Sequence, residues 1–426
     1  MLWKLLIITA MVSGGAALAG CGAPSDTASR PAPTQSSSDI SAFHAGLMVL
    51  DSHLDTPIRF HQSGYKFDRK GSWAEDGTHV DLYRMNEGGL DGGFWVIYIP
   101  QGPLNETAFQ AVRNAALMRQ TAIREFAARY NQQVELAFKR DDAVRILSAG
   151  KKIVFQSMEN AYPLGEDISL LETFYAGGLR MIGPVHFRNN QFADSATDIA
   201  PLHDGLSPLG EQLVREANHL GLILDGSHAS DDAVRDMMAL STTPIVLSHS
   251  GPKGVFDHPR NLPDDLLRDI AAAGGVIQVN AYGAYLEELV PSAAREKALA
   301  GWTAEYGGDA TGFSVDKLAA MRTARAQIDA EFPAPRSSFE TFMAHLLYML
   351  ELVGPDHVGI GADWDGGGGV IGMDDVSQLP RITAALVDAG YSDSDIAKIW
   401  GENLLRVLAD AEAARTSGLS SPVLVQ

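Results

Sequence analysis

The chain has 426 residues, of which 46% are hydrophobic and 20% charged, and its formal net charge is −20. This composition is ordinary for a folded soluble protein, and the length suits one α/β barrel with insertions. The negative charge argues against nucleic acid or an anionic membrane surface as a partner.

The first twenty residues predict a secretory signal that is not part of the fold. Lys4 precedes an apolar stretch, and the whole run is too short and too rich in small residues for a transmembrane helix. The LAGC sequence at residues 18–21 resembles a bacterial lipobox, in which Cys21 is lipidated; the alternative is an ordinary cleaved signal. Gly22 follows, which by resemblance to known lipoproteins favours a cell-envelope protein anchored by lipid in the outer membrane, facing the periplasm. Cys21 is the only cysteine, so an intramolecular disulfide is excluded.

Residues 21–40 are rich in Ser, Pro, Ala and Thr and have no apolar period, so they predict a flexible tether behind the lipidated Cys21. The folded unit is expected to be one barrel over residues 41–415, followed by a C-terminal tail at residues 416–426.

Short apolar runs alternate with longer amphipathic segments along this unit. We predict eight strands, at residues 47–50, 93–99, 153–158, 179–185, 222–225, 244–248, 276–280 and 357–361. The predicted helices include residues 106–130, 209–220, 231–240 and 263–273, with Ser207 and Ser230 as N-caps of two of them. Eight strand–helix repeats favour an α/β protein with a closed (β/α)₈ barrel of the TIM type over an open doubly wound sheet. No glycine-rich phosphate-binding motif follows any of the strands.

One stretch departs from this alternation. Residues 286–338 form an insertion after the seventh strand, with a helix predicted at residues 315–332. It would rise from the rim that carries the active site in such barrels, so it is either a lid or an oligomer contact. The sequence does not decide between the two.

Polar side chains follow most of the predicted strands. Residues two apart on a strand point to the same side, so the pair after the first strand, His53 and Asp55, can chelate one divalent metal. The groups after the third, fourth, fifth, sixth and eighth strands are, in order, Glu159, His186, His228, His249 and Asp363. Enzyme barrels keep their chemistry at the C-terminal ends of the strands, so we expect all of these side chains to meet in one pocket. Bound cations would offset the cost of burying so many of them.

Nitrogen and oxygen ligands without a thiolate favour Zn²⁺, with Mn²⁺, Fe²⁺ and Co²⁺ as alternatives. Five ligands exceed the roughly three that one catalytic zinc takes from the protein, so two ions that share a carboxylate fit better. Taken alone, Glu159 and Asp363 could each be turn residues, and a lone loop histidine is more often a surface or capping residue. We assign to that background His44, His61, His79, His219, His345 and His357.

The order of these motifs resembles the membrane (renal-type) dipeptidase family, the M19 peptidases. The resemblance runs from about residue 46 to residue 410 and rests on the motifs DSHLDTP, Glu159, His186, LDGSHAS, LSHSGP, HPRNLPDD, GIGADWDG and GENLLRV. It implies a barrel with a di-zinc centre that hydrolyses the peptide bond of free dipeptides through a hydroxide bridging the metals, with tolerance for a D-residue at the C-terminal position. Dimerisation is usual in the family, but no surface patch in this sequence demonstrates a homodimer.

The resemblance also assigns roles position by position. One zinc ion would be held by His53 and Asp55 and the other by His228 and His249, with Glu159 bridging them. The remaining positions would serve catalysis and substrate binding: carbonyl contact by His186, carboxylate recognition by Arg260, proton transfer by Asp363 and substrate contact by Tyr285.

Two departures put the choice of substrate in doubt, but not the reaction. The segment around His186 lacks the cysteine and the Thr-Pro-Trp run of better-known members, and the insertion after Tyr285 is longer than in the mammalian enzymes. β-Lactam hydrolysis and the natural dipeptide are left open.

Two other functions are alternatives. One is a different di-metal barrel hydrolase, such as an amidohydrolase, but those enzymes commonly open with His-x-His and often bridge the metals with a carbamylated lysine. The His-x-Asp pair and Glu159 disfavour it. The other is a non-catalytic lipoprotein that binds cell-wall peptides, which is disfavoured because the ligands and Asp363 are all present.

Overall fold

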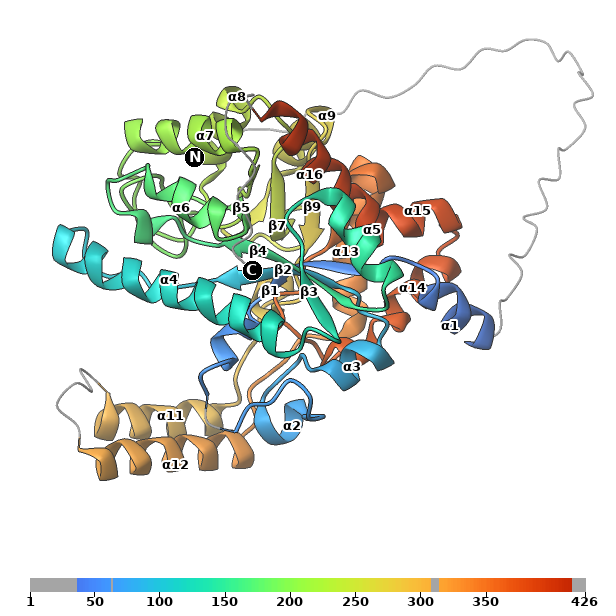
Figure 1. The fold of residues 1–426 in the computed structure, drawn as a ribbon. Helices are drawn as coiled ribbons and strands as arrows, with labels where there is room; N and C mark the ends of the chain where they lie inside the picture. The colour runs from blue at the N-terminus through green and yellow to red at the C-terminus, as the bar shows by residue number, and fades with distance from the viewer. Residues whose placement is uncertain (1–36, 63, 308–313, 416–426) are drawn as a thin grey trace, which may run out of the picture. The chain divides into compact units, whose positions relative to one another are not determined.

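A computed structural model describes residues 37–62, 64–307 and 314–415 (Figure 1). The predicted signal segment with Cys21, the tether up to residue 36 and the tail at residues 416–426 lie outside the described residues. Among the helices described, none is both long and apolar enough to cross a membrane.

Within the described residues the strands pair in parallel, as the strand–helix alternation predicts. One sheet supplies the strands β1 (Leu50–Leu54), β2 (Gly92–Ile97), β4 (Lys152–Met158), β5 (Leu179–Ile182) and β6 (Ile223–Leu224). A second sheet supplies β7 (Val246–Pro252), β9 (Val276–Val279) and β10 (Val358–Ile360). Two isolated bridges join the sheets at both edges, Asp225 to Val246 and Leu54 to Trp364. The eight strands therefore close into the predicted (β/α)₈ barrel.

The first strand lies further along the chain than predicted. We expected residues 47–50, whereas β1 spans Leu50–Leu54 and includes His53. Apolar periodicity missed it because Asp51 and Ser52 are polar, although both are buried. The Asp51 carboxylate accepts the backbone N–H groups of His53, at 2.8 Å, and Ala362, at 3.0 Å. Burial raises the pKa of Asp51 to about 7.

A glycine on β2 allows the close approach of this strand to β1. Gly93 has a φ of 151°, and a Cβ there would lie 1.8 Å from the Asp51 carbonyl oxygen. Only a residue without a side chain fits, because of both the backbone conformation and the space.

Helices surround the strands in Figure 1. In chain order they are α1 (Ser37–Ala45), α2 (Trp73–Asp76), α3 (Leu82–Glu87), α4 (Glu106–Arg129), α5 (Arg140–Ser148), α6 (Leu170–Ala176), α7 (Pro208–Leu220), α8 (Asp231–Leu240), α9 (Asp264–Ala272), α10 (Gly283–Leu286), α11 (Ala293–Tyr306), α12 (Val315–Glu331), α13 (Phe339–Val353), α14 (Pro380–Asp388), α15 (Asp393–Ala397) and α16 (Asn403–Ala414). Both predicted caps are confirmed, since Ser207 accepts the N–H of Gly210 and Ser230 that of Ala233. Two short strands outside the barrel were not predicted, β3 (Val134–Leu136) and β8 (Asn261–Leu262).

The insertion contains two helices, α11 and α12, which pack side by side (Figure 1). Only α12 was predicted. Arg295 of α11 pairs with Asp329 of α12 at 2.6 Å, and Trp302 Nε1 donates to the Met321 carbonyl oxygen at 3.0 Å. Polar and aromatic contacts thus hold the two helices together.

One hydrophobic cluster joins the strands of the barrel to the last helix. It contains Leu50, Phe94 and Phe155 from three of the strands and Leu404 and Leu408 from α16. The rings of Phe94 and Phe155 stack with their centroids 5.1 Å apart. This cluster lies among the N-terminal halves of the strands. The predicted site residues lie instead toward the C-terminal ends, as in other enzyme barrels.

Candidate metal centre

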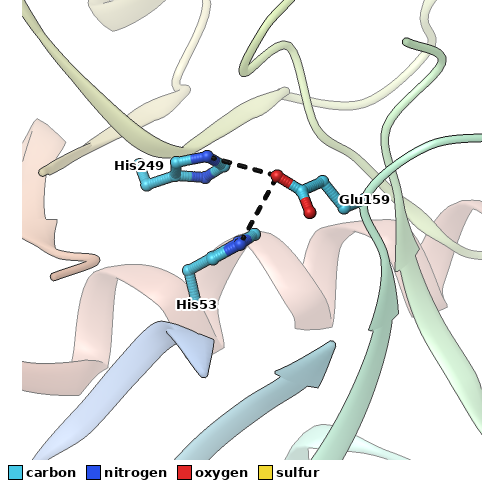
Figure 2. Close-up of side chains that lie close together, drawn as sticks. All are labelled: His53, Glu159 and His249. Atoms are coloured by element: carbon cyan, nitrogen blue, oxygen red, sulfur yellow. Dashed lines mark ion pairs between the residues drawn. The ribbon is translucent and has the colours of Figure 1, made fainter. Parts of the chain in front are cut away.

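The carboxylate of Glu159, directly after β4, lies at the middle of a group of histidines. Its Oε1 atom lies 3.0 to 3.7 Å from the Nε2 atoms of His228, His186, His249 and His53, in order of increasing distance. Figure 2 shows the rings of His53 and His249 next to each other, both facing the Glu159 carboxylate, and their centroids lie 3.8 Å apart. Glu159 is buried, as are all four histidines. The structure therefore brings these five predicted residues together.

The two predicted aspartates complete the group on the side of β1. His53 Nε2 lies 3.3 Å from Asp55 Oδ2, and His53, Asp55 and Asp363 offer ligand atoms within 4.8 Å of one another. A Cβ at Gly366 would lie 2.1 Å from a carboxylate oxygen of both Asp55 and Asp363. The glycine run after β10 thus lets the backbone close over both carboxylates.

Unusual backbone conformations hold two of these side chains in place. His228 has a φ of 68° and Asp363 a φ of 63°, in the left-handed region that residues with a Cβ rarely adopt. The Asp363 carbonyl oxygen accepts the N–H groups of Gly366, Gly367 and Gly368 at 3.2, 3.2 and 2.8 Å. Such local strain persists where the surrounding structure fixes it, and it is concentrated at functional sites.

Burial and mutual charge shift the ionisation of the group. Burial lowers the pKa of His53, but the charges of Asp55 and Glu159 outweigh burial and raise it to about 10. Burial raises the pKa of Glu159 and of Asp363, although the positive charge of His53 opposes the rise. Without a cation, the site therefore retains protons that an exposed carboxylate would lose.

The rings of His228 and His249 are neutral. Burial and nearby positive charge hold the pKa of both His228 and His249 well below the ordinary value. Their Nε2 atoms nevertheless lie 2.8 Å apart. Two imidazole lone pairs at this distance repel unless a proton or a metal ion lies between them.

These observations test whether the group fits a metal. His53 Nε2 and His228 Nδ1 are buried without a hydrogen-bond partner among the described residues. Three sets of side chains each offer ligand atoms within 4.8 Å of one another: His53, Glu159 and His249; Glu159, His186 and His228; and His53, Asp55 and Asp363. Glu159 and His53 each belong to two of these sets. Neutral imidazole and carboxylate ligands without a thiolate suit zinc and neighbouring divalent metals. The residues fit a metal site, and the overlap of the sets fits two ions.

The predicted substrate residues lie beside this group. Arg260 is buried, donates to the His249 carbonyl oxygen at 3.0 Å, and has its Cζ 5.3 Å from the ring centroid of Tyr285. Its Nε has no hydrogen-bond partner within the described part of the chain. Burial lowers the pKa of Arg260 and raises that of Tyr285 to about 12. A fixed cation next to a neutral phenol suits recognition of an anionic group.

Aromatic residues that the sequence did not single out surround His186. The ring centroid of His186 lies 4.9 Å from that of Tyr98 and 3.8 Å from that of Phe187. Tyr98 follows β2 directly, so its place at a strand end was the available signal, but we had included it in the predicted strand. Burial, followed by the positive charge of Arg260, lowers the pKa of His186 to about 3, so its ring is neutral.

Some histidines that we expected at the surface or in caps are buried instead. His345 Nε2 bonds the Leu286 carbonyl oxygen at 2.9 Å, and His44 bonds Thr383 and the Gly88 carbonyl oxygen at 2.6 and 2.9 Å. His79 is also buried and accepts the N–H of Asp365 at 2.8 Å. Hydrogen bonds stabilise these rings in the interior, where a neutral imidazole packs like other small aromatics.

Comparison with known proteins agrees with this geometry. The sequence matches the family described as membrane dipeptidase (peptidase family M19) over residues 38–421. It is 32% identical over 354 residues to dipeptidase tcpJ of Claviceps purpurea, which covers 81% of this chain and 72% of that protein. Dipeptidase verJ of Clonostachys rogersoniana is 28% identical over 346 residues, with 79% of this chain and 76% of that protein covered.

Solved structures of similar fold include the probable dipeptidase PvdM from Pseudomonas aeruginosa. It has a TM-score of 0.75 and 33% identity, and the match covers 89% of this chain and 98% of that chain. A metallopeptidase from Rhodobacter sphaeroides, solved with a phosphinate mimic of the dipeptide L-Ala-D-Ala, has a TM-score of 0.67. Its identity is 24%, over 86% of this chain and 99% of that chain, which shows a shared fold.

Proposed function

This chain belongs to the membrane dipeptidase family, peptidase family M19, and we propose that it hydrolyses free dipeptides with two zinc ions and accepts a D-residue at the C-terminal position. Membership makes it a dipeptidase, a hydrolase of the metallopeptidase class. The number and identity of the metal ions, the stereochemistry and the individual roles below are the proposal.

One observation carries the proposal. Glu159 Oε1 lies 3.7 Å from Nε2 of His53 and 3.6 Å from Nε2 of His249, so one carboxylate oxygen faces a proposed ligand of each zinc ion (Figure 2). A carboxylate at such a position can bind one ion with each oxygen or share one oxygen between two ions.

We assign the ligands accordingly. His53 and Asp55 would hold one zinc ion and His228 and His249 the other, with Glu159 shared between them. When bound, the ions supply a water of lowered pKa and a positive charge that polarises the carbonyl of the scissile bond.

Asp363 is the proposed proton carrier. It lies next to Asp55 and His53, and burial raises its pKa. Bound cations would lower that pKa again and leave a carboxylate close to the attacking water. Asp363 would accept the proton of this water and return it to the leaving amine, as a general base and then a general acid.

Arg260 and His186 are proposed to bind two polar groups of the dipeptide, its free carboxylate and the carbonyl of its scissile bond. The guanidinium of Arg260 is buried and its Nε has no partner among the residues described, so it can pair with the free carboxylate of the substrate. The neutral ring of His186, with Nε2 at 3.4 Å from Glu159 Oε1, would donate to the carbonyl oxygen as negative charge develops on it. Tyr285, beside Arg260, would contact the substrate through its ring.

The test combines metal analysis with a panel of L,L and L,D dipeptides, assayed with and without a chelator. We expect two equivalents of zinc per chain, cleavage of free dipeptides including L,D members, and loss of activity in EDTA that zinc restores. Full activity in EDTA with no bound transition metal would contradict the metal mechanism. Cleavage of L,L members alone would contradict only the stereochemical part.

We also propose that Cys21 carries a lipid that anchors the enzyme in the cell envelope, at the periplasmic face of the outer membrane. The support is the LAGC sequence at residues 18–21 and Gly22 after it. Intact mass of the full-length protein from a bacterial membrane fraction would reveal the lipid, and an unmodified Cys21 would exclude it. Light scattering on the same preparation tests whether the protein forms the homodimer that is usual in the family.

A further inference from the structure

Ser248 lies behind the proposed metal ligands and approaches one histidine of each proposed zinc set. Its Oγ lies 2.8 Å from Nδ1 of His249 and 3.4 Å from Nδ1 of His53, whereas the Nε2 atoms of the same rings face Glu159. Ser248 is completely buried in β7. A single hydroxyl therefore touches the rear nitrogen of one proposed ligand from each zinc set.

Asp225 determines the direction of the hydrogen bonds around this hydroxyl. Asp225 Oδ2 lies 2.5 Å from Ser248 Oγ, and Asp225 Oδ1 accepts the backbone N–H groups of Ser227 and Ser248, both at 2.9 Å. An ionised carboxylate only accepts hydrogen bonds, and a serine hydroxyl has one proton. Ser248 therefore donates its proton to Asp225, and only its lone pairs are left for the histidine nitrogens.

The consequence is a fixed tautomer. A hydroxyl that presents lone pairs requires an N–H on the ring it meets, so Nδ1 of His249 carries the proton and Nε2 keeps the lone pair that binds a metal. His53, at the longer distance, meets lone pairs of the same hydroxyl, so its Nδ1 would likewise carry the proton once Nε2 binds a metal. His228 differs, because its Nδ1 has no hydrogen-bond partner among the described residues and its position is set by a backbone φ of 68°.

We propose that Asp225 and Ser248 are positioning residues that hold His249 and His53 in the tautomer that binds metal, and so couple the affinities of the two zinc sites. The inference rests on the proposed zinc site but adds residues outside its ligand set. In metalloproteins, a partner behind a ligating histidine orients the ring, and its loss typically weakens metal binding by roughly 10–100-fold.

The decisive variant is Asp225→Asn, which keeps the size of the side chain and reverses the polarity of the chain of hydrogen bonds. The amide N–H₂ can donate to Ser248 Oγ, which frees the hydroxyl proton for Nδ1 of His249. The ring would then carry its proton on Nε2, where the metal has to bind. Ser248→Ala is less informative because it leaves the buried Asp225 carboxylate without its hydroxyl donor, so it is expected to be unstable.

The first measurement is a zinc titration of the metal-free protein against a competing chelator. We expect both zinc affinities of Asp225→Asn to fall by roughly 10–100-fold, and those of the control Ser250→Ala to stay at the wild-type values. Ser250 is a matched control, since it is a buried serine on the same strand whose hydroxyl lies 3.4 Å from Ser227 Oγ instead of against a histidine.

The second measurement is ¹⁵N NMR of the histidine rings in the metal-free protein, which reports the tautomer whether or not zinc binds. We expect a proton on Nδ1 of His249 in the wild type and on Nε2 in Asp225→Asn, a change that a merely structural role would not produce. A wild-type protein that binds no zinc would overturn the proposed function, while the spectra would still decide the tautomer. Identical tautomers and affinities in wild type and Asp225→Asn would overturn the present inference alone.

Discussion

The Nε2 atoms of His228 and His249 lie 2.8 Å apart, and Glu159 Oε1 lies 3.0 Å from the first and 3.6 Å from the second. Both rings are neutral because burial lowers their pKa. Two uncharged imidazoles and a carboxylate at these distances form a concentrated set of lone pairs, and a divalent cation stabilises such a set better than a single proton does.

Glu159→Gln is expected to weaken both metal sites together. The amide keeps the shape of the side chain but loses its charge and one acceptor, while the four histidines around it are unchanged. Loss of a residue that only hydrogen-bonds to a metal ligand typically weakens metal binding by roughly 10–100-fold. Because Glu159 is a proposed ligand itself, we expect the zinc affinity of Glu159→Gln to fall by at least that factor. Metal content after dialysis against a graded chelator series measures the effect. A variant that holds two equivalents as tightly as the wild type would exclude a shared carboxylate.

The stabilisation by metal should increase with pH. The pKa of His53 is about 10 in the metal-free site, because the charges of Asp55 and Glu159 outweigh the effect of burial. A raised histidine pKa contributes stability that is fully present below the ordinary pKa of 6.5 and is lost as the pH rises through about 10. Metal binding displaces this proton, so the loaded protein does not undergo that loss. Calorimetry should therefore give a larger difference in Tm between loaded and metal-free protein at about pH 9 than at about pH 6. A difference independent of pH would contradict this assignment.

The barrel was predictable from the sequence because most of its strands contain a short apolar run, and apolar periodicity detects such runs. β7 (Val246–Pro252) extends beyond the predicted end at residue 248, because its second half, with His249 and Ser250, is polar. β1 was displaced in the prediction because its buried residues Asp51 and Ser52 are polar and are stabilised by hydrogen bonds to backbone far away in sequence. Ser52 Oγ, for example, donates to the Ser248 carbonyl oxygen at 2.5 Å. Such long-range partners cannot be seen in a local pattern.

The ligand cluster was predictable for a similar reason, since His, Glu and Asp recur at strand ends and the barrel gathers those ends. The residues behind the cluster were not, because nothing local distinguishes Asp225 from an ordinary strand-end acid or Ser248 from other buried serines. Their roles depend on which atoms face which, as in the 2.5 Å contact between Asp225 and Ser248. The same holds for Tyr98, whose contact with His186 joins two separate strand ends.

Arg260→Ala is expected to discriminate between substrates with and without a free carboxylate. Loss of a buried guanidinium that pairs with a carboxylate should lower kcat/KM for free dipeptides by about 10²–10³-fold, on the order of 3–4 kcal/mol. C-terminally amidated dipeptides, already poor substrates, should change little. Steady-state kinetics with matched free and amidated substrates tests this, with Arg260→Lys as the control that keeps the charge. Equal losses on both substrates would point to the contact between Arg260 and the His249 carbonyl oxygen as its main role.

Asp363→Asn should separate metal binding from turnover. Asparagine tolerates the φ of 63° at this position better than alanine does, so the loop after β10 should keep its shape. The amide cannot accept and return a proton, and loss of a general base typically costs about 10²–10⁴-fold in rate. We expect both zinc equivalents to remain while kcat falls by that factor. Near-normal kcat with full metal would refute proton transfer by Asp363.

Asp365 is expected to stabilise the loop that carries Asp363. It is buried, has a φ of 66°, accepts from Thr56 Oγ1 at 2.8 Å and from the His79 N–H at 3.0 Å, and pairs with Arg59 at 3.4 Å. Asp365→Ala removes all three acceptor contacts and places alanine in a left-handed conformation, which should cost about 3–5 kcal/mol.

Asp365→Asn is the matched variant, since it keeps one acceptor oxygen and tolerates positive φ, and should cost only about 1–2 kcal/mol. Chemical denaturation of the metal-free protein measures both losses without interference from binding. If the two variants lose the same amount, the charge of Asp365 and not its geometry stabilises the loop. If neither variant loses stability, the loop after β10 is held by its glycine turns and by the hydrogen bond that the backbone N–H of Asp55 donates to the Trp364 carbonyl oxygen at 2.8 Å.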